Sequence, residues 1–72
     1  DADYDAGMTA FDNGKGLDAV RLFKKSGSAK SYYMLGLIYE NGCATVGSNG
    51  MMARKNFKKA AEMGHEEAKS KL

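Results

Sequence analysis

The chain has 72 residues, 43% of them hydrophobic and 28% charged, and a formal net charge of +2. This length allows one small domain with a modest core, and the composition is ordinary for a globular protein. The weak charge, with basic and acidic residues interleaved, argues against nucleic acid as a partner. No apolar run reaches the roughly 18 residues that indicate membrane insertion. Because Cys43 is the one cysteine, no disulfide can form within the chain.

Two helices are predicted in the first third of the chain, over residues 1–13 and 17–25. In each, apolar side chains recur at helical spacing, which places them on one face. These are Tyr4, Met8 and Phe11 in the first helix, and Ala19, Val20 and Phe23 in the second.

The third predicted helix, residues 29–41, is apolar on more than one face, so we expect neighbours on two sides of it. Ser28 is a suitable N-cap, and Asn41-Gly42 is suited to end the helix. Gly36 lies in its middle, where a glycine costs about 1 kcal/mol relative to alanine. We therefore expect Gly36 to let another helix approach closely.

A glycine-rich loop, residues 42–50, is predicted to be flexible or tightly turned. Asn49 can cap a fourth helix over residues 50–63, which Gly64 would end. A fifth helix is expected over residues 65–72, with Ala68 and Leu72 as its apolar residues. The apolar stripe of the fourth helix is Ala53, Phe57, Ala60 and Ala61.

The helices repeat in sequence. Phe23-Lys24-Lys25 recurs 34 residues later as Phe57-Lys58-Lys59, and Gly27-Ser28 recurs 37 residues later as Gly64-His65. Ala19 and Ala53 each lie four residues before the phenylalanine. A repeated helix pair of this length predicts an all-α fold of the solenoid type.

The segment from Gly27 to Leu72 resembles the Sel-one-like repeat family, a branch of the tetratricopeptide-like solenoids. The match covers one complete unit and the opening of the next. Two departures are Asn49 in place of the usual Asp and Asn56 in place of the usual Trp, and the loop carries one extra residue. The matching positions are Ser31, Leu35-Gly36, Tyr39, Gly42, Val46, Asn49, Ala53, Phe57, Ala60-Ala61 and Gly64-His65.

The resemblance implies a short right-handed superhelix of antiparallel helix pairs, with about five helices in a single domain. Residues 1–27 would be a degenerate N-terminal repeat in which Gly7-Met8 replaces Leu-Gly, and residues 28–64 a full repeat. Residues 65–72 would open a further repeat and act as a lid, with Leu72 covering the open end. We expect four aromatic residues to anchor the core, Phe11, Phe23, Tyr39 and Phe57.

Catalysis has little support from the residues. His65 is the only histidine. We favour a role for it as a helix cap or turn residue over a role as a general base or metal ligand. For Cys43, the role of an unreactive loop residue is favoured over that of a reactive thiol. Residues 42–50 lack the Gly-Lys-Ser or Gly-Lys-Thr ending of a phosphate-binding loop. We therefore expect no enzyme activity, no cofactor and no metal site. The basic pairs are favoured as solvated helix surface: Lys24-Lys25, Arg54-Lys55 and Lys58-Lys59.

The leading hypothesis is a protein–protein interaction module, an adaptor or scaffold that binds a peptide or partner protein on its concave face. By resemblance, the first helix of each pair lines this face. Tyr33 and Leu37 lie four residues apart and form one patch, or else both belong to the core. The expected face consists of Asp5, Thr9, Asp12, Asn13, Lys30, Tyr33, Leu37, Glu40, Asn41, Glu67 and Ser70.

Two alternatives remain: a regulatory or targeting domain of a larger enzyme or secreted effector, and a structural fragment of a longer solenoid. The first residue is Asp1 rather than Met, which is expected of a processed or cut chain. Family resemblance favours an exported or periplasmic bacterial protein, with the cytoplasm as the other location. Both open ends of a short solenoid could also stack on another copy.

Overall fold

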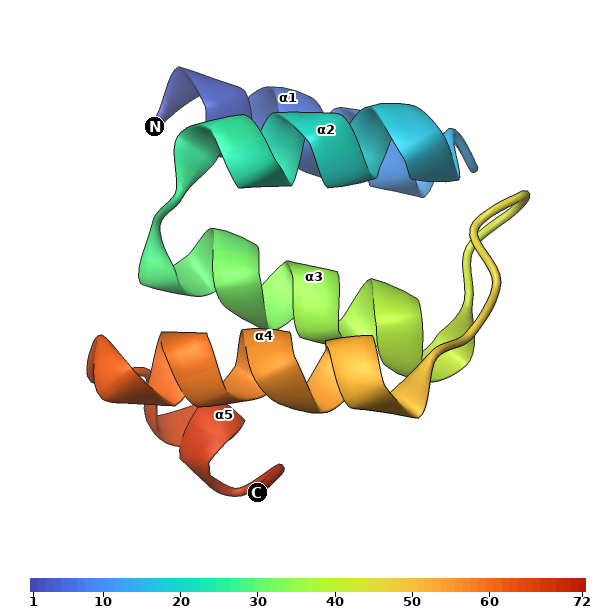
Figure 1. Cartoon of the computed structure of the whole chain (residues 1–72). Coiled ribbons are helices and arrows are strands. Elements are labelled where there is room, and N and C mark those ends of the chain that lie inside the picture. Colours follow the sequence, from blue (N-terminus) through green and yellow to red (C-terminus); the bar gives the residue numbers. More distant parts are fainter.

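The computed structural model describes all 72 residues as five helices joined by short connections. The helices α1 and α2 form one antiparallel pair, α3 and α4 form the next, and α2 packs against α3 between the pairs (Figure 1). The short α5 packs against α4 on the opposite side from the first pair. The predicted all-α class and the antiparallel pairing of about five helices are confirmed. The bounds are α1 Ala2–Asp12, α2 Gly16–Ser26, α3 Ala29–Asn41, α4 Gly50–Glu62 and α5 Glu66–Lys69.

Side-chain caps fix where the helices begin. The Ser28 side chain accepts a hydrogen bond from the amide of Ser31, and the Asn49 side chain accepts one from the amide of Met52. Both caps were predicted, and each satisfies an amide that has no partner inside its helix. At the start of α1, a carboxylate oxygen of Asp1 accepts from two such amides.

The core consists of two clusters of different size. The larger one lies between the helix pairs, and Phe23 and Leu35 at its centre are fully buried. The smaller one lies between α4 and α5 and consists of Ala53, Phe57, Ala60 and Ala68. Two of the four predicted anchors, Phe23 and Phe57, are buried, whereas Phe11 and Tyr39 are only partly buried at the edges of the clusters. The larger cluster is Ala10, Ala19, Val20, Phe23, Met34, Leu35, Ile38 and Val46.

A glycine in the first helix of each pair admits a phenylalanine ring from the second helix. A Cβ on Gly7 would lie 2.7 Å from the Phe23 ring, and a Cβ on Gly36 would overlap the Phe57 ring. A tyrosine three residues before each glycine packs on the same ring, Tyr4 at 5.8 Å and Tyr33 at 5.7 Å between centroids.

These contacts correct the predicted alignment of the two units. The sequence pattern matched Gly7-Met8 with Leu35-Gly36, whereas the packing pairs Gly7 with Gly36. In the structure, the first helices therefore correspond at an offset of 29 residues, and the second helices at 34. The reason is physical: the glycine is needed where the ring crosses, whatever its neighbours in the sequence.

The loop between α3 and α4 folds back over the start of α2. Cys43 and Val46 exchange two backbone hydrogen bonds of 2.9 Å across a tight turn, in which Ala44 has a positive φ of 53°. Val46 is thereby buried in the larger cluster, and the backbone of Cys43 lies so close to Gly16 that no Cβ would fit there. Of the two alternatives predicted for this loop, flexible or tightly turned, the second is therefore correct (Figure 1, yellow).

The C-terminal segment differs from its prediction. The helix α5 ends at Lys69 instead of continuing to residue 72, and Leu72 is 55% exposed. The expectation that Leu72 covers the open end is therefore wrong. Ala68, which is fully buried against α4, makes that contact instead. No helix of the structure combines the length and the apolar character needed to cross a membrane.

Candidate functional site

The α1 part of the predicted concave face is a polar stripe. Asp5, Thr9 and Asp12 are all exposed and follow one another at helical spacing, so they share one face of α1. The Thr9 hydroxyl donates a hydrogen bond of 3.2 Å to the backbone oxygen of Asp5. The Asp5 and Asp12 carboxylates have no ion-pair partner in the structure, so both are free to meet an external cation or hydrogen-bond donor.

The α3 part of this face combines exposed polar residues with two partly buried apolar ones. Lys30 and Asn41 are exposed, whereas Tyr33 and Leu37 are partly buried. The Tyr33 ring packs on Phe57 and stacks on His65, with a centroid distance of 4.5 Å. Tyr33 therefore connects α3, α4 and α5 and is only partly exposed to solvent.

Two contacts place α3 relative to its neighbours on this side of the molecule. The Lys30 ammonium lies 5.9 Å from the centroid of the Tyr4 ring, which connects the start of α3 to α1. At the other end of α3, Glu40 forms an ion pair of 3.2 Å with Lys71. Glu67 is exposed on α5. The start of α3 thus contacts α1 through Tyr4, outside the polar stripe, and the C-terminal segment occupies the Glu40 end.

His65 acts as the cap of α5. Its Nδ1 accepts a hydrogen bond of 3.2 Å from the amide of Ala68, the same arrangement that Ser28 makes with Ser31 at the start of α3. This confirms the cap interpretation of the only histidine. No group of three or more His, Cys, Asp or Glu side chains lies close enough together to hold a metal ion.

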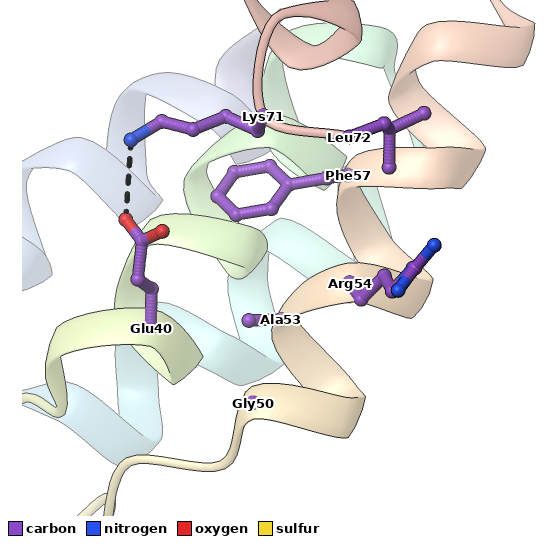
Figure 2. A pocket seen from close by; sticks show the side chains of 7 residues that line it. All are labelled: Glu40, Gly50, Ala53, Arg54, Phe57, Lys71 and Leu72. Carbon is purple, nitrogen blue, oxygen red and sulfur yellow. Dashed lines mark hydrogen bonds and ion pairs between the residues drawn. The ribbon is translucent and has the colours of Figure 1, made fainter.

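A pocket of about 190 Å³ opens between the end of α3, the outer face of α4 and the C-terminal segment (Figure 2). The Phe57 ring forms its apolar wall beneath Lys71 and Leu72, while Glu40 and Arg54 lie on opposite sides. The lining residues are Glu40, Gly50, Ala53, Arg54, Phe57, Lys71 and Leu72.

The charges around this pocket are unevenly balanced. Lys71 Nζ is 3.2 Å from a carboxylate oxygen of Glu40 and 5.7 Å from the Phe57 ring centroid, so its charge is already engaged. Arg54 is exposed and has no ion-pair partner in the structure. The pocket therefore offers an apolar wall next to one free cation.

Sequence reasoning named only Glu40 of the pocket residues as a site residue. The signal was nevertheless present, because Gly50, Ala53 and Phe57 repeat the spacing of Gly16, Ala19 and Phe23 exactly one unit later. The pattern identified a buried helix face but could not show that a pocket borders its second copy.

Comparisons with models of protein families, with curated proteins and with solved structures find no match to this chain.

Proposed function

We propose that the protein is a non-catalytic helical-repeat module that binds a peptide or partner protein along the α1, α3 and α5 face. The observation that carries this proposal is the repeated packing unit, in which a tyrosine and a glycine of one helix receive a phenylalanine of the next. Stacked helix pairs present extended surfaces from their first helices, and such surfaces are used for binding.

The Sel-one-like resemblance supports the same proposal. Gly36, Ala53, Phe57 and Ala60 are among the residues that carry the resemblance, and all are buried at helix contacts. Asn49, in place of the usual Asp, makes the cap expected of that position. With this support we propose that the protein is an adaptor or scaffold of Sel-one-like type, with export in a bacterium as the favoured setting.

The exposed charges indicate what kind of segment would bind. Asp5 and Asp12 are free carboxylates on α1, and Lys30 and Asn41 lie along α3. A peptide with basic or amide side chains would pair with the α1 stripe, while the exposed parts of Tyr33 and Leu37 would supply apolar contact. The rim charges would set orientation and on-rate more than affinity.

Selection of peptides from a random display library on the immobilised protein tests this function. We would compare the unchanged protein with a variant that carries Asp5→Asn and Asp12→Asn. The matched control carries Asp18→Asn and Glu62→Gln, which also remove one acid from a first helical turn and one from a last turn.

We expect the selected peptides to bind the Asp5/Asp12 variant about tenfold more weakly and the control within about twofold of the unchanged protein. Circular dichroism would establish that all three proteins are folded. Equal binding to all three folded proteins would overturn the assignment of the site to the α1 stripe.

A further inference from the structure

The second helix of each pair carries most of the positive charge. Together, α2 and α4 contain seven basic and two acidic residues, whereas α1, α3 and α5 contain two basic and six acidic ones. The small net charge of +2 therefore hides a strong separation of charge between the two sets of helices. Such a separation produces a local field that attracts anions to α2 and α4.

The basic residues follow the same pattern in both second helices. An exposed aliphatic residue begins each pattern, Leu17 in α2 and Met51 in α4, and these are 65% and 83% exposed. Exposed basic residues follow four, seven and eight positions later, a spacing that keeps the side chains on one face of the helix. We call these two stripes together the basic face. Its basic residues are Arg21, Lys24, Lys25, Lys55, Lys58 and Lys59.

The packing of the helix pairs directs both stripes to solvent. In α2, Ala19 and Phe23 are buried on the side of the helix opposite to the stripe, and Ala53 and Phe57 are buried in the same way in α4. The two helices also run in the same direction (Figure 1). The aliphatic residues that begin the stripes therefore lie at the same end of the molecule, where the loop between α3 and α4 is found.

Half of the basic residues on this face are without a partner in the chain. Lys24, Lys55 and Lys58 are exposed and form no ion pair. Arg21 and Lys25 pair with carboxylates that solvent also reaches, and such pairs contribute little in water. The basic face can therefore exchange its contacts with water for contacts with an external anion.

The aliphatic residues of the face decide between kinds of anion. Single-stranded nucleic acid binds proteins through stacking on aromatic rings, but Tyr32, the aromatic residue in contact with this face, is partly buried. The Lys59 ammonium also lies 5.1 Å from the centroid of that ring. A second copy of this chain would offer the carboxylates of its α1 stripe, which is polar and would leave the two aliphatic residues without apolar contact.

We propose that the basic face binds the surface of a bilayer that contains anionic phospholipids. The lysines of both stripes contact headgroup phosphates, and Leu17 and Met51 reach the boundary between headgroups and acyl chains. This contact is peripheral, since it uses side chains that are already exposed and needs no rearrangement of the helices. It does not use the α1 stripe, so it goes beyond the function proposed above and would hold a partner-binding module at a membrane.

Co-sedimentation of the full 72-residue protein with lipid vesicles tests this proposal. The probe is phosphatidylcholine vesicles that contain about 30% phosphatidylglycerol, and pure phosphatidylcholine vesicles are the control for surface charge. We expect saturable binding to the anionic vesicles and at least about tenfold weaker binding to the neutral ones. Binding should also weaken as the salt concentration rises from about 50 to about 300 mM, because salt screens the attraction.

A pair of charge variants locates the electrostatic contact. Lys55→Gln with Lys58→Gln should weaken binding to anionic vesicles at least about tenfold. The matched control is Lys30→Gln with Lys69→Gln, which lowers the net charge equally at two exposed lysines outside the basic face. We expect the control to weaken binding less than about threefold, because only the distant part of the attraction is lost.

A second pair of variants tests the aliphatic contact. Leu17→Ser with Met51→Ser should weaken binding about fivefold or more, because less apolar surface leaves water at the membrane. The matched control is Leu72→Ser with Met63→Ser, which removes the same two residue types where they are 55% and 51% exposed. We expect the control to bind within about twofold of the unchanged protein.

Equal binding to neutral and anionic vesicles would overturn the proposal, and so would equal effects of either variant and its control. Tighter binding of duplex DNA than of anionic vesicles, unchanged by the two aliphatic substitutions, would assign the basic face to nucleic acid instead. Sedimentation without vesicles at rising protein concentration would identify a second copy as the occupant. Circular dichroism would establish that each variant is folded.

The variant with Asp5→Asn and Asp12→Asn separates this proposal from the function proposed above. It should bind anionic vesicles at least as tightly as the unchanged protein, because it carries less negative charge. It should still lose affinity for the selected peptides. Loss of vesicle binding in this variant would mean that the membrane contact uses the α1 stripe and would overturn the assignment to the basic face.

Discussion

The two helix pairs contain the same packing unit but differ in how well it is covered. In the first pair, Phe23 is packed by α1 and by the following α3, and it is fully buried. In the second pair, Phe57 is packed by α3 but also lines a pocket. The larger cluster has eight buried residues and the smaller one has four. We therefore expect the same local contact to contribute differently to stability depending on the element that comes next.

Truncating the two phenylalanines should have the largest effect. We expect Phe23→Ala to destabilise the protein by about 3–5 kcal/mol, which approaches the whole stability of a domain of this size. Phe57→Ala should cost about 1 kcal/mol less, because the pocket beside it lets water reach part of the space left behind. Urea denaturation of both variants measures the difference, and equal losses would contradict the comparison.

Removing residues 65–72 should have the next largest effect. This deletion exposes Phe57, removes the buried Ala68 and abolishes the stacking of His65 on Tyr33. We expect a loss of about 3 kcal/mol from these contacts together. Thermal unfolding checks it, and an unchanged Tm would show that α5 adds nothing to the smaller cluster.

The two interior glycines distinguish the pairs by how closely their helices approach. Alanine is the better helix former by about 1 kcal/mol, but its Cβ would collide with a phenylalanine ring in both pairs. The collision is more severe at Gly36 than at Gly7. We expect Gly36→Ala to destabilise by about 2 kcal/mol and Gly7→Ala by about 1 kcal/mol. A stabilised Gly36→Ala variant in chemical denaturation would rule out this close approach.

The helix caps provide a comparison at equivalent positions. Ser28→Ala should cost about 1 kcal/mol through the lost cap. His65→Ala should cost slightly more, because it removes the cap of α5 and the stacking on Tyr33. The Tm of each variant measures this, with about 4–8 °C expected per kcal/mol. A smaller loss for His65→Ala would mean that the stacking contributes nothing.

The smallest effect is expected at the ion pair beside the pocket. The side chains of Glu40 and Lys71 are 41% and 35% exposed, so solvent screens the interaction between their charges. Lys71→Met should therefore change stability by about 0.5 kcal/mol or less. Chemical denaturation at low and high salt checks this, and a large, salt-dependent loss would show that the pair fastens the C-terminal segment.

Much of the fold could be read from local patterns. Ser28 and Asn49 predicted helix starts correctly, because a cap depends only on residues within one turn. Gly36 predicted a close helix approach, because a glycine inside a helix is otherwise unfavourable. The periodicity of apolar residues predicted five helices in pairs, and the recurrence of Phe23 as Phe57 predicted the repeat.

Other features depended on contacts between distant parts of the chain, and only the tertiary structure decided them. The pattern could not pair Gly7 with Gly36, because that match is set by where a ring from another helix crosses. Nor could it separate the core and surface alternatives for Tyr33, which depend on Phe57 and His65 arriving beside it. The pocket likewise depends on contacts between distant parts of the chain. Local sequence specified an apolar face on α4, and only the path of residues 70–72 decided that a pocket lies beside it.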